Sequence, residues 1–189
     1  MGAVDFRRYY DLESYLFGTV GSAFRRDGYL SAFDFFCIVI WKANRAKPRI
    51  SAKLLNRGHA SLDTAVRELT RGIAERPVPR DKLRYVMEEW SFRLPMASAL
   101  LTVLYPEEFT VYDVRVCEAV GPEFKRLAER RGSDDLWQDY EKFRQRVMES
   151  EPTGLTLRDK DRYLWGKSFH DQLQSDVKRC FGVVEGAHP

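Results

Sequence analysis

Apolar residues recur at helical spacing along most of the chain. Between residues 61 and 73 they fall three and four positions apart, at Leu62, Ala65, Val66, Leu69 and Ile73. This spacing places them on one face of an amphipathic helix. The same period predicts helices over residues 81–90 and 134–148, and Asp81 is suited to cap the first of these two.

Two further stretches extend the helical pattern. Residues 29–46 are mostly apolar over a length that is unusual for a strand, so they predict a buried helix that ends before Pro48. A last helix is predicted to begin at Thr156 or Leu157. Because strand patterns are scarce, the sequence predicts an all-α fold in a single domain, residues 1–189.

The central residues 81–120 carry the most specific pattern. A helix is followed by a turn at 91–95, a helix rich in small residues from Met96, an apolar, strand-like stretch at 109–112, and a helix that Asp113 opens. On local grounds Asp113 is an N-cap, because its carboxylate can accept hydrogen bonds from the first amides of that helix. The small residues are explained by close packing between helices.

Two segments of this stretch resemble the helix-hairpin-helix superfamily of DNA glycosylases. They are PMASALL at residues 95–101 and VYDVRV at residues 111–116. The segment IVIWKANR at residues 38–45 is similar to the polar helix end with which that family reaches its base pocket. The resemblance covers residues 29–120.

The resemblance implies both a fold and a mechanism. The fold is a compact helical bundle with two lobes and a cleft between them, in which the hairpin spans 81–105 and the catalytic segment spans 109–120. A stacked base is out of reach, so the nucleotide flips out of the duplex into a pocket. Asp113 then stabilises the oxocarbenium-like sugar and activates water, as carboxylates do in glycoside hydrolysis.

Two positions depart from the family pattern. The turn SFRLP at residues 91–95 contains no glycine, so we expect Arg93 to supply positive charge in place of a cradle of backbone amides. Pro95 and Met96 stand where bifunctional members carry a lysine that forms a Schiff base. The second departure predicts a monofunctional enzyme without lyase activity.

Further residues are candidates for contact with DNA. The candidates for a base pocket or wedge are Trp41, Lys42, Asn44, Arg45 and Tyr112. The candidates for other DNA contacts are Arg93, Met96, Ser98, Arg115 and Lys160.

Plainer explanations stay open for several of these candidates. Lys42 and Arg45 fit a solvated helix end, and Tyr112 fits a core position. Arg115 can pair with Glu118 on its own helix. The alternating charges around Lys160 fit a solvated helix face.

Composition and charge narrow the class of partner. The net charge of +3 and the pI of about 8.7 permit a nucleic-acid partner, and residues 45–57 contain five basic residues and no acid. The three cysteines and three histidines are scattered, so we expect no metal site, no disulfide and no cofactor. Buried thiols in a reducing cytoplasm fit this pattern. No apolar run is long enough to span a membrane.

These observations favour a bacterial, cytoplasmic, monomeric DNA glycosylase. It would bind double-stranded DNA with a flipped-out base and leave an abasic site. The excised base would be a damaged base in DNA repair, or an enlarged base of phage DNA in antiviral defence. Two other classes stay open: a non-catalytic DNA-binding module on the same scaffold, and a helical protein-interaction domain without affinity for DNA.

Overall fold

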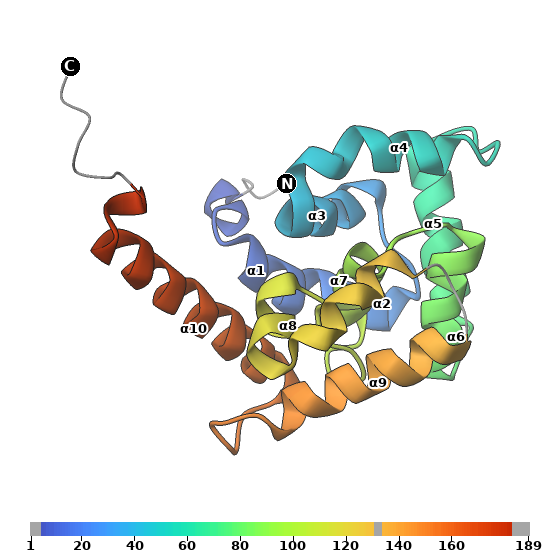
Figure 1. The fold of residues 1–189 in the computed structure, drawn as a ribbon. Helices are drawn as coiled ribbons and strands as arrows, with labels where there is room; N and C mark the ends of the chain where they lie inside the picture. The colour runs from blue at the N-terminus through green and yellow to red at the C-terminus, as the bar shows by residue number, and fades with distance from the viewer. Residues whose placement is uncertain (1–4, 131–133, 183–189) are drawn as a thin grey trace.

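Helices form all of the regular secondary structure that the structure describes. The computed structural model describes residues 5–130 and 134–182, and within these ranges it contains helices and no strands. The prediction of an all-α fold is confirmed for this part of the chain. Figure 1 shows the helices packed around α7, with α3 and α4 at one end of the bundle and α9 along the opposite side.

The elements follow one another with short connections. Up to the central turn they are η1 (Phe6–Tyr9), α1 (Leu12–Ser14), η2 (Tyr15–Val20), α2 (Gly21–Asp27), α3 (Ala32–Ala43), η3 (Asn44–Ala46), α4 (Lys47–Leu55), α5 (Leu62–Ala74), α6 (Pro79–Arg84) and η4 (Tyr85–Glu89). After it they are α7 (Leu94–Leu104), α8 (Val114–Val120), η5 (Pro122–Glu129), α9 (Asp134–Glu149), α10 (Leu157–Lys178) and η6 (Cys180–Gly182). The η segments are short 3-10 or π-helical turns.

Local capping explains where several helices begin. Ser31, Ser61 and Thr156 each accept a hydrogen bond from the backbone N–H three residues on, at the start of α3, α5 and α10. The predicted starts of α5 and α10 are therefore confirmed to within a residue. The helix predicted to end before Pro48 is α3, which ends at Ala43. Pro48 itself lies in the first turn of α4, where a missing N–H leaves no helical hydrogen bond unmade.

The helix α7 lies at the centre of the core. Nine of its eleven residues are buried, and the small residues Ala97, Ser98 and Ala99 let neighbouring helices approach closely. A similar approach occurs at Gly21 of α2, where an added Cβ would lie 2.8 Å from the carbonyl oxygen of Val103. Close packing thus accounts for the small residues of this helix.

The stretch at 109–112 is extended but unpaired, which corrects the strand-like expectation. Its backbone is held by side chains from three helices. The Tyr140 hydroxyl of α9 accepts from the N–H of Thr110 at 3.1 Å and donates to its carbonyl at 2.7 Å. Ser98 Oγ accepts from the N–H of Tyr112 at 2.9 Å, and Asp161 Oδ2 of α10 accepts from the N–H of Val111 at 3.3 Å. These bonds fix the chain that leads into Asp113.

The two ends of the described chain differ in how they pack. The N-terminal elements α1 and η2 pack against α3 and α7, whereas the C-terminal part of α10 extends away from the bundle (Figure 1). Cys37 and Cys117 are buried as expected. Cys180, just beyond α10, is exposed, which corrects the expectation that all three thiols are buried.

Candidate active site

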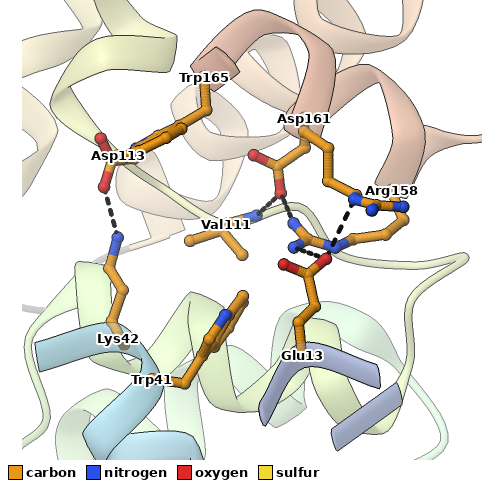
Figure 2. A pocket seen from close by; sticks show the side chains of 9 residues that line it. Glu13, Trp41, Lys42, Val111, Asp113, Arg158, Asp161 and Trp165 are labelled. Carbon is orange, nitrogen blue, oxygen red and sulfur yellow. Dashed lines mark hydrogen bonds and ion pairs between the residues drawn. The ribbon is translucent and has the colours of Figure 1, made fainter. Parts of the chain in front are cut away.

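A pocket of about 520 Å³ opens where α1, the end of α3 and the first part of α10 meet the segment after α7. It is lined by Glu13, Trp41, Lys42, Val111, Asp113, Arg158, Asp161, Arg162 and Trp165. Figure 2 shows that these side chains come from α1, the end of α3, the extended segment and α10. Its volume lies in the range of small-molecule sites. The pocket brings together three of the residues singled out from the sequence: Trp41, Lys42 and Asp113.

Asp113 has two roles in this arrangement. It is the N-cap of α8, and its Oδ1 accepts a hydrogen bond from the N–H of Arg115 at 3.0 Å. Its Oδ2 accepts from Lys42 Nζ at 2.7 Å, and the side chain keeps 25% of its surface exposed to the pocket. Capping and a place in the pocket are therefore compatible for this carboxylate.

The surroundings of Asp113 favour its ionised form. Burial alone would raise its pKa, but the Lys42 charge, the Lys42 hydrogen bond and the Arg115 N–H together hold the pKa below the ordinary value of 3.8. Asp113 is therefore an anion at neutral pH, in a position where positive charge on a bound molecule would be stabilised.

Lys42 reaches Asp113 from the last turn of α3. Its Nζ also donates to the carbonyl of Tyr112 at 3.2 Å, and 13% of its side chain is exposed. Figure 2 shows this side chain pointing across the pocket to Asp113. The partners are 71 positions apart in the chain, so only the fold brings them together.

Two tryptophans line the pocket. Trp41 packs edge-on against Phe17 with ring centroids 5.8 Å apart. Trp165 stacks on Phe169 at 5.6 Å with nearly parallel planes, and the Arg115 guanidinium lies 5.6 Å from the Trp165 ring. Indole faces in a pocket are suited to stack on flat aromatic ligands.

The remaining side chains form a charged network at one side of the pocket. Arg158 pairs with Glu13 at 2.8 Å and with Asp161 at 2.5 Å, and Arg162 pairs with Glu13 at 3.1 Å. Asp161 is almost fully buried, and burial raises its pKa to about 6 against the opposing charge of Arg158 and the Val111 N–H. In the sequence, Arg158, Asp161 and Arg162 belong to a run of alternating charges that is typical of a solvated helix face, and Glu13 lies far from this run, so no local pattern marks these residues as a site.

Several pocket candidates lie elsewhere. Tyr112 is buried and its hydroxyl bonds the carbonyls of Phe124 and Lys125, so it is a core residue, which corrects its assignment to the base pocket. Asn44 and Arg45 are exposed in η3 beside the pocket and do not line it.

The other DNA-contact candidates are also dispersed. Arg115 is half-buried and donates to Gln172 on α10 at 2.7 Å, and not to Glu118. Met96 is half-buried at the start of α7. Ser98 is fully buried and holds the N–H of Tyr112, and Lys160 is 2% exposed and donates to the carbonyl of Ser150. Ser98 and Lys160 therefore cannot reach DNA, which corrects both assignments.

The turn between η4 and α7 forms a second, smaller hollow. Arg93 lines it with Lys53, Ser91 and Arg130, away from Asp113. Ser91 adopts a φ of +56°, a left-handed conformation that usually favours glycine. Lys53 donates to the carbonyl of Ser91 and Arg57 to that of Glu89, so two of the five basic residues between positions 45 and 57 hold this turn.

No metal cluster stands out in the described part of the chain: no three histidine, cysteine or acidic side chains gather there as ligands. Within the same residues, no helix has the length and apolar character needed to cross a membrane. Comparisons with protein-family models, with curated proteins and with solved structures find no match. The chemistry of the pocket is therefore the main basis for a functional proposal.

Proposed function

We propose that this chain is a DNA glycosylase of helix-hairpin-helix type, which hydrolyses the N-glycosidic bond of a damaged or modified base. In this interpretation α6, η4 and α7 with their turn form the hairpin, and the pocket is the cleft between two lobes. The observation that supports the proposal most directly is the ionised Asp113 carboxylate, which lines a pocket that also contains two tryptophans.

The pocket offers a place for each part of a flipped-out nucleotide. The base would stack on the indole faces of Trp41 and Trp165. Its sugar would lie at Asp113, whose negative charge stabilises the positive charge that develops at C1′ when the bond to the base breaks. Water adds to C1′, the base leaves with a proton, and an abasic site remains in the duplex.

The charged residues at one side of the pocket favour some bases over others as the substrate. Glu13, Arg158 and Arg162 offer both acceptors and donors to the polar substituents of a base. A base enlarged by hydroxyl-bearing groups would use more of these contacts than a small lesion. We therefore favour an enlarged base, as in phage DNA, over a common repair substrate.

The test is release of free base from duplexes that each contain one modified base, among them uracil, an alkylated purine, an oxidised purine and a glycosylated hydroxymethylcytosine. We expect Asp113→Asn to lower the rate of release by at least about 100-fold while duplex affinity stays within a few-fold. Asparagine is as good an N-cap as aspartate, so α8 is preserved.

Asp11→Asn is the matched control, because Asp11 caps α1 through the N–H of Ser14 and does not line the pocket. This variant should release base at the wild-type rate. Full activity of Asp113→Asn would remove Asp113 from the reaction, and no release from any duplex would count against the glycosylase.

One observation favours a second candidate, a protein-interaction domain. Phe169, Leu173 and Val177 are exposed and recur every four residues on the part of α10 that extends from the bundle. Such a stripe is typical of a helix face that packs on a partner. A flat duplex titration at low salt would favour this candidate over both the enzyme and the non-catalytic DNA-binding module.

A further inference from the structure

The Trp165 indole lies at the point where α10 leaves the bundle. Leu164, the residue before it, is the last buried residue of this helix, and Trp165 itself is 43% exposed. At the next position, Gly166, an added Cβ would meet open space. Packing inside the bundle therefore does not hold this indole, although it forms a wall of the pocket. A loosely held tryptophan loses side-chain freedom when a ligand stacks on it, and this loss weakens binding.

Two side chains that do not line the pocket hold the indole instead. The Phe169 ring, one turn further along α10, stacks on it with ring centroids 5.6 Å apart and planes 6° apart. The guanidinium carbon of Arg115, on α8, lies 5.6 Å from the Trp165 ring centroid and 5.7 Å from that of Phe169. At such distances the aromatic faces attract a cation. Arg115 also donates to Gln172 Oε1 at 2.7 Å, so its guanidinium is itself held in place.

The backbone of Arg115 contacts the other functional group of the site. Asp113 Oδ1 accepts from the Arg115 N–H at 3.0 Å, and Figure 2 shows the Trp165 indole beside Asp113. We propose that Arg115 is a positioning residue that fixes the Trp165 indole relative to Asp113, so that a flat ligand meets a preformed wall. The inference rests on the proposed function for the identity of that ligand, a flipped-out base.

A plainer role for Arg115 is a contact with a DNA phosphate, and the two roles make opposite predictions for Arg115→Met. Methionine removes the guanidinium but is as good a helix former as arginine, and it keeps the backbone N–H that Asp113 accepts. A phosphate contact predicts that the slope of log affinity against log salt falls by about one contact while Trp165 stays in place. The positioning role predicts that the indole loses its fixed place while the slope is kept.

The position of the indole is measured by fluorine NMR of the full chain labelled with 5-fluorotryptophan. The sequence contains four tryptophans, and loss of one signal in Trp165→Phe identifies that of Trp165. In the wild type this signal should lie well away from that of free 5-fluorotryptophan, because a ring and a guanidinium flank the indole. In Arg115→Met it should move most of the way toward the free value. The other signals, among them that of the buried Trp90, should stay and so show an intact fold.

Phe169→Ala and Leu173→Ala form a matched pair of variants. Both residues are exposed to a similar extent, 44% and 42%, one turn apart on α10. Leu173 lies about 12 Å along the helix from Trp165, out of reach of its ring. Phe169→Ala should move the Trp165 signal as Arg115→Met does, whereas Leu173→Ala should leave it unchanged. Arg146→Met, at an exposed arginine of α9 that does not line the pocket, should also leave it unchanged.

A Trp165 signal that keeps its wild-type position in Arg115→Met would overturn the inference, and so would a wild-type signal already at the free value. On any duplex that releases base, Arg115→Met should raise KM at least about fivefold with kcat within about twofold, because binding is weakened while Asp113 keeps its contacts. An unchanged KM would also overturn it.

The NMR experiment contains no DNA, so the two proposals fail separately. Base release with an unmoved Trp165 signal overturns the positioning role and leaves the glycosylase standing. A moved signal without base release from any duplex supports the positioning role and counts against the glycosylase.

Discussion

Asp113 shows how one side chain can cap a helix and line a pocket at the same time. Its two carboxylate oxygens face different partners, the amide of Arg115 and the ammonium of Lys42. The first interaction is local and could be predicted from an acid that precedes a helix. The second joins residues far apart in the chain, so no local pattern contains it. The residues next to Asp113 in the sequence therefore predict the cap, but they do not predict the Lys42 charge that lowers the pKa of the Asp113 carboxyl.

Asp161 presents the opposite case, because burial raises its pKa to about 6. A carboxyl with a raised pKa holds its proton more tightly in the folded than in the unfolded chain. Its contribution to the free energy of unfolding is thus fully present below about pH 4 and is lost as the pH rises through 6. Loss of this contribution should cost the wild type on the order of 2 to 3 kcal/mol between pH 4 and pH 7.

We predict that Asp161→Asn removes this part of the pH dependence. Denaturant unfolding of both proteins at several pH values between 4 and 7 measures it. The stability of the wild type relative to the variant should fall as the pH rises. Parallel curves over this range would show that Asp161 does not titrate as its burial implies.

At the scale of elements, the segment 109–112 is the part that positions the site. It has no neighbouring strand, and its peptide groups depend on hydroxyl and carboxylate groups from α7, α9 and α10. Buried peptide groups that lose such partners are costly. The geometry of Asp113 therefore depends on Ser98 and Tyr140, which do not line the pocket, as well as on Asp161, which does.

We predict that Tyr140→Phe destabilises the fold by about 1 to 3 kcal/mol, because both the N–H and the carbonyl of Thr110 lose their hydroxyl partner. Thermal or denaturant unfolding measures the loss. Tyr163→Phe is the matched control, since Tyr163 is 43% exposed on α10 and its change should be nearly neutral. Equal stability of the two variants would mean that Thr110 finds other partners.

The elements themselves could largely be predicted, for physical reasons. The amphipathic period of α5 and the Ser61 cap are local, and the structure reproduces both. Pro48 lies beyond the end of α3, as predicted, but it stands in the first turn of α4 and does not itself end α3, because a proline is tolerated where a helix begins. Residues 109–112 have the apolar composition of a strand, but the partners that replace a strand lie on three distant helices.

At the scale of the whole molecule, the site combines α1, the end of α3, the segment that leads into Asp113 and the first part of α10. Trp41, Lys42 and Asp113 could be singled out beforehand because they fall in the segments from which the sequence predicts a glycosylase. Glu13 and Arg158 could not be singled out, because their ion pair forms only when α10 packs close to α1 in the folded chain. Lys160 was misassigned for the same reason: its helix face is set by packing, and it points inward.

The net charge of the molecule is small, so any DNA affinity depends on where the cations lie. Arg45 is exposed immediately after the helix end that carries Trp41 and Lys42, whereas Arg71 is exposed on α5, at the side of the bundle away from α10 (Figure 1). If DNA covers the pocket, Arg45 lies near its phosphates and Arg71 does not. Both arginines are exposed helical residues, so their removal should affect folding to a similar, small extent.

We predict that Arg45→Ala weakens duplex binding several-fold at low salt and lowers the slope of log affinity against log salt by about one phosphate contact. Arg71→Ala should change neither quantity. Fluorescence anisotropy with an unmodified duplex between about 50 and 200 mM salt gives both the affinity and the slope, independently of any base release. The reverse result, a loss with Arg71→Ala alone, would place DNA on the α5 side, where the Asp113 carboxylate could not reach a nucleotide.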